Sequence, residues 1–234
     1  MIEVRNLTKY YGRSTALRNL NLNINTGECI AVFGRNGAGK TTFLRILAGL
    51  IRPSSGNFTI NFPDGKTPRF ARGSIGYLSH SMSLYPDLTA LENLRFFAGL
   101  MNVCADDDAL IRCMEEVGLR GREFDPTRNY SRGMQQRLAI ARAFLHDPAI
   151  LLLDEPFTGL DQVGLEVMEN YIHRAKAQKK TCIMTLHDLA LGYALADRLV
   201  VLEKGAAALD VSKRSLTLDG FLEKYKTLII TSNQ

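Results

Sequence analysis

The stretch CIAVFGRNGAGKTTFLRILAGL, residues 29–50, decides the fold of this chain. It opens with a continuously apolar run that has the length of a strand buried in a parallel sheet. The segment from Gly34 to Thr41 then matches the pattern G-x-x-x-x-G-K-[ST] at every position. A helical pattern begins near Lys40 and ends before Pro53. A buried strand, a glycine-rich loop and a helix in this order predict an α/β fold.

The glycine-rich loop has the chemistry of a phosphate-binding site. Its glycines allow the backbone to approach an anion and to turn its N–H groups inward. The helix that follows directs its positive end toward the same place. Lys40 supplies a cation for terminal phosphates, and the Thr41 hydroxyl supplies an oxygen ligand of the kind that Mg²⁺ prefers. The motif therefore predicts a site for a nucleotide with Mg²⁺.

Two further apolar runs are followed by residues that suit phosphate chemistry. Asp154 and Glu155 follow Ile150–Leu153, and ligands bind at the carboxyl ends of strands in open α/β folds. Asp154 suits a Mg²⁺ shell, and Glu155 suits a base that orients or deprotonates water. His187, after Thr181–Leu186, could donate a hydrogen bond to a phosphate. Acids and histidines after strands are also ordinary loop residues, so the pattern alone leaves both interpretations open.

The pattern along the rest of the chain divides it into two kinds of structure. Short strands dominate the first part, and strands alternate with helices toward the end, which predicts a parallel-sheet α/β core. The middle is helical in pattern. We therefore expect a single domain, 1–234, with a core from residues 1–80 and 147–234 and a helical subdomain from residues 81–146. The helices expected in this subdomain are Ala90–Met101, Asp106–Val117 and Arg132–Leu145.

Composition and charge exclude several classes of protein. The chain has 234 residues, of which 46% are hydrophobic and 23% are charged. These values exclude collagen-like, low-complexity and disordered chains. The net charge of +5 suits an anionic ligand or a membrane-facing protein, but it is too diffuse to indicate nucleic acid.

Cysteine usage and hydropathy indicate the compartment. The four cysteines form no C-x-x-C pair and fit no zinc pattern. Cys29 and Cys182 lie in apolar runs, where free thiols act as small hydrophobes, so a reducing compartment fits best. The N-terminus has no apolar signal core, and no stretch approaches the ~20 apolar residues that span a bilayer. We expect a cytoplasmic protein, with any membrane part on another polypeptide.

A further segment, Tyr130–Arg137 (YSRGMQQR), resembles the signature segment of the ATP-binding-cassette (ABC) ATPases. Four other features match the same family, in the same order, across essentially the whole chain. They are the phosphate loop, the segments Asp154-Glu155-Pro156 and Gly159-Leu160-Asp161, and His187. The resemblance implies a P-loop NTPase core with a mixed sheet, an N-terminal antiparallel β part and an inserted all-helical subdomain. It also implies ATP hydrolysis with Mg²⁺ in a head-to-tail homodimer that drives a separate transmembrane permease.

The resemblance assigns roles to individual residues. Tyr11 would stack on adenine, and the alternative from the sequence is a half-buried strand tyrosine. Asp154 would assist Mg²⁺, Glu155 would be the catalytic base, and His187 would be the switch histidine. Asp161 would lie at the dimer interface. The phosphates would be held by Gly34, Arg35, Asn36, Gly37, Ala38, Gly39, Lys40, Thr41 and Thr42.

The signature segment departs from the family pattern at two positions. Arg132 stands where the family has Gly, and Met134 stands where it has Gln. Ser131 and Gly133, the residues implied to bind the γ-phosphate held by the opposite protomer, are both present. Ser131 is also a sound helix N-cap.

His80 is a third departure, because the family has Gln at this position of the metal site. An imidazole nitrogen replaces an oxygen ligand of Mg²⁺ poorly. His80 could act through a bridging water, or the hydroxyls of Ser79 or Ser81 could take that role. We favour the indirect role for His80.

These features resemble exporter-type cassettes, and most of all the ATPase of the haem exporter of cytochrome c biogenesis. The expected function is the ATP-hydrolysing subunit of an ABC transporter, with no nucleic-acid partner. The alternative is a cytosolic ABC ATPase that acts on ribosomes or DNA. Such proteins usually carry two cassettes or a long coiled-coil insert, and this chain has neither. A nucleotide kinase or GTPase would leave the signature segment unexplained.

The membrane partner is expected to contact the helical subdomain. Its first loop carries four apolar residues before the N-cap at Thr89, and exposed apolar loops can mark interaction sites. The same residues could instead fold back onto the helices. They are Met82, Leu84, Tyr85 and Pro86. His146 and His173 have no functional context and are expected at the surface.

Overall fold

The computed structural model describes residues 1–62, 73–79 and 82–231 of the chain. Its larger sheet has six strands in the order β5-β6-β7-β3-β8-β9, of which the first five are parallel and β9 is antiparallel to β8. In the same order these strands are Ile75–Leu78, Ile150–Asp154, Thr181–Thr185, Cys29–Phe33, Arg198–Glu203 and Ala206–Ser212. The expected α/β fold with a mixed sheet is confirmed.

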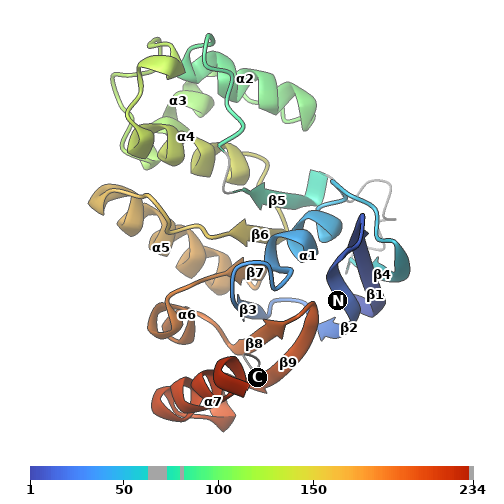
Figure 1. The fold of residues 1–234 in the computed structure, drawn as a ribbon. Coiled ribbons are helices and arrows are strands. Elements are labelled where there is room, and N and C mark those ends of the chain that lie inside the picture. The colour runs from blue at the N-terminus through green and yellow to red at the C-terminus, as the bar shows by residue number, and fades with distance from the viewer. Residues whose placement is uncertain (63–72, 80–81, 232–234) are drawn as a thin grey trace.

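The parallel strands are buried on both faces, as their apolar runs predict. In β3, Ile30 and Val32 face one apolar core, whereas Cys29, Ala31 and Phe33 face the other. The first face packs against α1, Lys40–Leu47. The second face packs against three helices on the opposite side of the sheet (Figure 1). These are α5, Gln162–Ala177, α6, Leu189–Leu195, and α7, Leu218–Thr231.

A second, antiparallel sheet of three strands covers α1 from the other side (Figure 1). Its strands are ordered β2-β1-β4 and span Ser14–Ile24, Ile2–Tyr11 and Ser55–Ile60. The buried residues of β2 alternate with exposed ones, as a half-buried strand requires. This sheet is the N-terminal antiparallel part that the sequence predicted.

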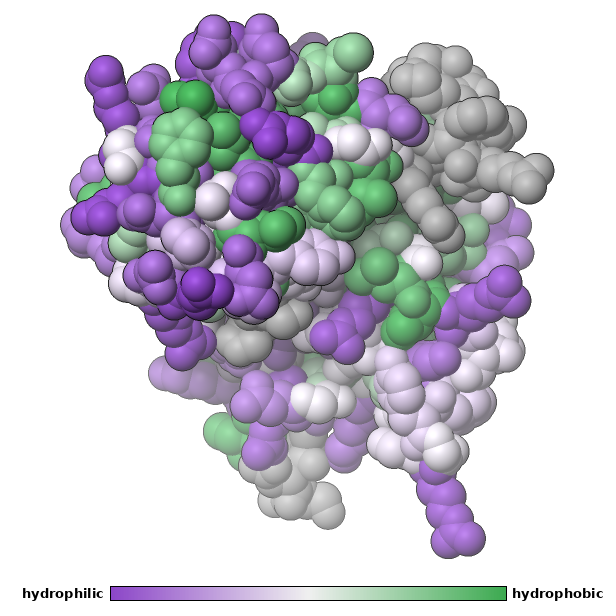
Figure 2. Space-filling model, turned by 90° about the horizontal axis from the view of Figure 1, so that it is seen from above, coloured by the Kyte–Doolittle hydropathy of each residue, from purple (hydrophilic) through white to green (hydrophobic). Residues whose placement is uncertain are grey.

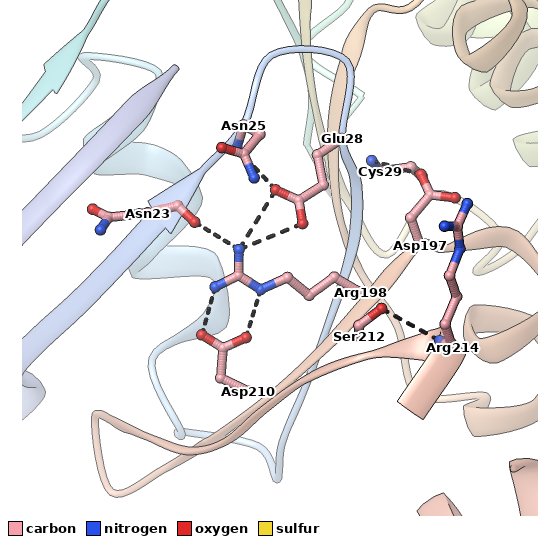
Figure 3. Close-up of polar contacts among 9 residues, drawn as sticks. All are labelled: Asn23, Asn25, Glu28, Cys29, Asp197, Arg198, Asp210, Ser212 and Arg214. Atoms are coloured by element: carbon pink, nitrogen blue, oxygen red, sulfur yellow. Dashed lines mark hydrogen bonds and ion pairs between the residues drawn. The ribbon is translucent and has the colours of Figure 1, made fainter. Parts of the chain in front are cut away.

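Arg198, at the start of β8, ties the two sheets together (Figure 3). Its guanidinium group donates to both carboxylate oxygens of Asp210 on β9, at 2.5 and 2.6 Å, and to the backbone carbonyl of Asn23 on β2, at 2.6 Å. It also lies 3.4 Å from the Glu28 carboxylate. The hydrogen bonds with Asp210 are the main cause that raises the pKa of Arg198. The network fixes the antiparallel sheet against the edge of the larger sheet.

In the described part of the chain, three α-helices lie between β5 and β6 and form the upper part of the molecule in Figure 1. They are α2, Ala90–Leu100, α3, Asp107–Glu116, and α4, Arg132–Phe144. Thr89, Asp106 and Ser131 are their N-caps, and each side chain accepts a hydrogen bond from a backbone N–H of the first turn. The predicted helices are correct to within a residue at each end, because the caps are visible in the sequence.

The prediction of a surface position for His146 is wrong. His146 is half-buried, and its Nε2 lies 3.1 Å from the carbonyl oxygen of Ile75 at the start of β5. Burial is the main cause that lowers its pKa. His173 is exposed, as expected. Over the residues that the structure describes, no helix is both long and apolar enough to cross a membrane.

Candidate active site

The glycine-rich loop joins the carboxyl end of β3 to α1, and its shape requires glycine at two positions. Gly34 has φ 145° and Gly39 has φ 103°. A Cβ atom at Gly34 would lie 2.3 Å from the carbonyl oxygen of Leu202, and one at Gly39 would lie 2.3 Å from that of Ala16. Any other residue at these positions would therefore disrupt the loop.

Lys40 is the first residue of α1 and is buried, with 6% of its surface exposed. Its Nζ donates to the carbonyl oxygens of Gly34, at 2.7 Å, and Arg35, at 3.2 Å. Burial is the largest influence on its pKa and lowers it, while the negative charges of Glu155 and Asp154 act in the opposite direction. A desolvated ammonium beside this loop has a strong attraction for a phosphate oxygen.

Asp154, the last residue of β6, lies beside the loop. Its Oδ1 accepts hydrogen bonds from the hydroxyls of Thr41, at 3.0 Å, and Thr185, at 2.8 Å. Its Oδ2 is buried and has no hydrogen-bond partner among the residues that the structure describes. A buried carboxylate oxygen of this kind needs a partner. Together with the Thr41 hydroxyl it fits Mg²⁺, which takes one or two protein oxygens and completes its shell with water and phosphate.

Glu155 adopts a left-handed backbone conformation, with φ 54°, which is uncommon for a residue other than glycine. Its N–H donates to the hydroxyl of Thr185 at 2.9 Å. Its Oε1 lies 2.7 Å from Nε2 of His187. The two proposed catalytic residues, Glu155 and His187, are therefore in direct contact, although 32 positions separate them in the sequence.

Lys40, Thr41 and Glu155 line a cleft of about 310 Å³, and Asp154 is buried behind it in contact with Thr41. Tyr11, at the end of β1, forms part of its wall and is 48% exposed. The Nζ of Lys9 lies 5.2 Å from the centre of the Tyr11 ring. An exposed aromatic ring at the wall of such a cleft can stack on a planar base. The cleft is lined by Tyr11, Ser14, Thr15, Ala16, Asn36, Gly37, Ala38, Gly39, Lys40, Thr41, Thr42 and Glu155.

Ser131 and Gly133 do not line this cleft. They lie at the start of α4, where the Ser131 hydroxyl accepts from the N–H of Met134 at 3.2 Å. A Cβ atom at Gly133 would lie 2.9 Å from the carboxylate of Asp161. Within one chain, Gly133 therefore packs against Asp161, and neither signature residue lines the cleft beside the phosphate loop. His80 lies outside the described residues.

Thr185 is the site residue that the sequence reasoning missed. It is fully buried at the end of β7 and contacts both Asp154 and Glu155. The sequence contained a signal, because a threonine stands in the apolar run two positions before His187. The sequence pattern places it in a buried strand and indicates no partner for its hydroxyl.

A second hollow of about 560 Å³ separates α2 and α4 from the end of α1 and from β5. Its wall includes the apolar side chains of Leu50, Phe97, Leu100 and Met101. Leu50 and Leu100 are 60% and 61% exposed. Figure 2 looks down on the helical part and shows hydrophobic groups exposed among hydrophilic ones on this side of the molecule.

The sequence of this chain is similar to those of a known protein family. The sequence model of the family described as "ABC transporter" matches residues 17–158. The uncharacterized ABC transporter ATP-binding protein YdbJ of Bacillus subtilis is 35% identical over 214 residues, which cover 91% of this chain and 69% of YdbJ. The cytochrome c biogenesis ATP-binding export protein CcmA of Pseudomonas savastanoi is 39% identical over 170 residues, 72% of this chain and 79% of CcmA.

A solved structure matches the fold. The dimeric post-hydrolysis state of the ATP-binding cassette MJ0796, bound to ADP and Pi, superposes with a TM-score of 0.79 at 29% identity. The match covers 92% of this chain and 99% of that cassette. The phosphate loop, the acid pair and the whole-chain match lead to one conclusion: the chain belongs to the ABC transporter family and is the ATP-binding, ATP-hydrolysing subunit of such a transporter.

Proposed function

We propose that this subunit hydrolyses Mg-ATP in a head-to-tail homodimer, and that it powers export through a separate membrane permease. The observation that carries the proposal is the cluster at the carboxyl ends of β3, β6 and β7. There Lys40 and Glu155 line one cleft, and Asp154 lies beside it in contact with Thr41. One Asp154 oxygen has no partner among the described residues, and Glu155 contacts His187.

Different residues of the site bind the nucleotide and take part in the reaction. Tyr11 stacks on the adenine, and the loop N–H groups with Lys40 hold the phosphates. Thr41 and Asp154 would hold Mg²⁺, which supplies charge neutralisation to the phosphates when bound. Glu155 accepts a proton from the attacking water, and its contact with His187 keeps the carboxylate oriented.

The second half of each site comes from the partner protomer. Ser131 and Gly133 lie at the start of a helix, where backbone N–H groups suit a γ-phosphate. Neither residue lines the cleft of its own chain, which supports a second copy of the chain as their source at each site. Asp161, which packs against Gly133, would lie at the same interface.

Mixing two inactive variants tests the head-to-tail arrangement. Lys40→Ala removes the cation that binds the phosphates. Ser131→Asp keeps an N-cap residue but introduces a carboxylate that repels the γ-phosphate. Each variant alone should be inactive. In a mixed dimer one of the two sites pairs an intact loop with an intact signature, so mixing should restore a measurable part of the wild-type ATPase rate. If mixing restores nothing while wild-type protein mixed with either variant stays active, the shared site is wrong.

We further propose that the chain divides into a nucleotide-binding core, 1–80 and 147–234, and a helical subdomain, 81–146, and that the permease docks at the hollow between them. Tyr85 and Pro86 are exposed in the segment that follows Ser83, a residue of the hollow's wall, whereas Met82 and Leu84 pack onto the helices. Of the four residues expected to contact the partner, two therefore stay available. The relationship to an export protein favours export, and docking would hold the chain at the cytoplasmic face of the membrane.

The docking proposal is tested with Leu100→Arg, which places a charge in the apolar hollow. The variant should keep the ATPase rate of the isolated subunit and lose co-purification with the multi-span permease from native membranes. Arg112→Ala, at an exposed position of α3, is the control and should change neither. Normal co-purification of Leu100→Arg would place the contact elsewhere.

A further inference from the structure

The buried hydroxyl of Thr185 connects the two acidic residues of the site. Asp154 and Thr185 are opposite each other in the parallel pairing of β6 with β7. Both are the last residues of their strands, and they are 2% and 0% exposed. Their side chains lie on the α1 face of the sheet, which they share with the alternating neighbours Leu152 and Ile183.

The hydroxyl is used as a donor and as an acceptor at once. It donates to Asp154 Oδ1 at 2.8 Å and accepts the Glu155 N–H at 2.9 Å. A threonine hydroxyl has one proton and two lone pairs, so both bonds can form together. Valine has the same shape but can form neither, which makes the chemistry of this position specific.

One of the two hydrogen bonds orients the carboxylate of Asp154, and the other supports the backbone of Glu155. Thr185 and Thr41 both occupy Oδ1 of Asp154, which leaves Oδ2 as the open oxygen. The bond to the Glu155 N–H satisfies a backbone group at φ 54°, where the strand pairing has ended. It therefore supports the unusual conformation from which the Glu155 carboxylate reaches His187.

We propose that Thr185 is a positioning residue for ATP hydrolysis, whose hydroxyl sets the rotamer of Asp154 and the backbone of Glu155 together. The proposal rests on the proposed roles of Asp154 with Mg²⁺ and of Glu155 as the base. It predicts that loss of one hydroxyl weakens metal-dependent nucleotide binding and slows turnover, without any loss of contact to the nucleotide itself.

The test uses three variants of one strand. Thr185→Val removes the hydroxyl, and Thr185→Ser retains it. Thr181→Val is the matched control, because Thr181 is buried at the other end of β7, on the same face, and its hydroxyl accepts from the N–H of Gly27. Thermal unfolding of each variant checks that the chain folds.

Two readouts separate positioning from simple destabilisation. In Thr185→Val we expect kcat to fall at least about tenfold with KM for ATP changed less, because buried partners of the hydroxyl lose their bond. The gain in affinity for a fluorescent ATP analogue on adding Mg²⁺ should shrink, while binding in EDTA stays within about twofold of wild type. Thr185→Ser should restore both quantities, and Thr181→Val should alter neither.

The outcomes distinguish this inference from the proposed site. A Thr185→Val variant with kcat and Mg²⁺-dependent binding within about twofold of wild type overturns the positioning role. Equal losses in Thr181→Val and Thr185→Val also overturn it, because strand stability alone would then explain the effect. A parallel Glu155→Gln variant tests the site itself: if Glu155→Gln turns over normally, the role given to Glu155 fails whatever Thr185→Val does.

Discussion

Lys40 and Glu155 line the same cleft but have different proposed roles. Lys40 is buried and held by loop carbonyls, and its proposed role is to bind the phosphates. Glu155 is held by a backbone hydrogen bond and by His187, and its proposed role is in the reaction of water. Substitution at each residue should therefore give a different kinetic result.

Glu155→Gln should retain Mg-ATP binding and slow turnover by at least about 10²-fold, because the amide cannot accept the proton while the phosphate site stays intact. Lys40→Ala should lose productive binding, because the phosphates lose their buried cation. Equilibrium binding and single-turnover hydrolysis, measured side by side, check both. Near-normal turnover in Glu155→Gln would mean that another group is the base.

Tyr11 lines the cleft and is proposed to stack on the adenine. Tyr11→Ala should weaken ATP binding roughly 5- to 100-fold, since stacking on a base contributes ~1–3 kcal/mol. Tyr11→Phe should bind almost normally, because the ring is retained. Titration with a fluorescent nucleotide measures both. Equal losses in the two variants would contradict stacking and indicate a role for the hydroxyl.

At the scale of elements, Arg137 links α4 to two neighbouring segments. Its guanidinium group donates to the carbonyl oxygens of Val117, at 2.9 Å, and Gly118, at 2.7 Å, and lies 3.5 Å from the carboxylate of Asp161, the N-cap of α5. On the same helix, Gln136 donates to the carbonyl oxygen of Thr158. These side chains hold the loop that follows Glu155 against α4, the helix that begins in the signature segment.

Arg137→Met should lower the free energy of unfolding by ~1–3 kcal/mol, because it leaves two carbonyls with no guanidinium donor. Arg112→Met, at an exposed site on α3, should change it by less than about 0.5 kcal/mol. Chemical denaturation gives both values. If Arg137→Met lowers the free energy of unfolding no more than Arg112→Met does, the contacts of Arg137 contribute nothing to stability.

At the scale of the whole molecule, His146 joins the helical part to the edge of the sheet. It follows α4 closely, and its ring reaches the Ile75 carbonyl at the start of β5. Its Nδ1 is buried with no partner among residues 1–62, 73–79 and 82–231. Burial is the main cause of the lowered pKa, Lys180 lowers it further, and the Ile75 carbonyl and Asp147 oppose both.

The lowered pKa predicts how stability depends on pH. The unfolded chain binds a proton at His146 near pH 6.5, whereas the folded chain binds it only at lower pH. The contribution of His146 is therefore complete above about pH 6.5 and is lost as the pH falls through the folded pKa. His146→Gln should reduce the pH dependence of the free energy of unfolding in this range, by at most ~1.4 kcal/mol per pH unit.

The matched control is His173→Gln, at an exposed position of α5, which should leave the pH dependence unchanged. Urea denaturation at several pH values between 5 and 8 measures all three proteins. If His146→Gln has the same pH dependence as the wild type, the ring is not held neutral by burial.

The helices, the strands and the phosphate loop could be predicted from the amino-acid sequence. These features depend on local geometry, which short sequence patterns indicate directly. Examples are apolar runs of strand length, N-caps such as Ser131, and the glycines at positions 34 and 39. The contacts between strand ends that are distant in the sequence could not be predicted, because they depend on tertiary packing. The Asp154–Thr185 register, the Glu155–His187 contact and the burial of His146 depend on the order in which strands pair and helices pack. A hydroxyl or imidazole has the same sequence signature in solvent and in a core, so only the packing around it fixes its partner.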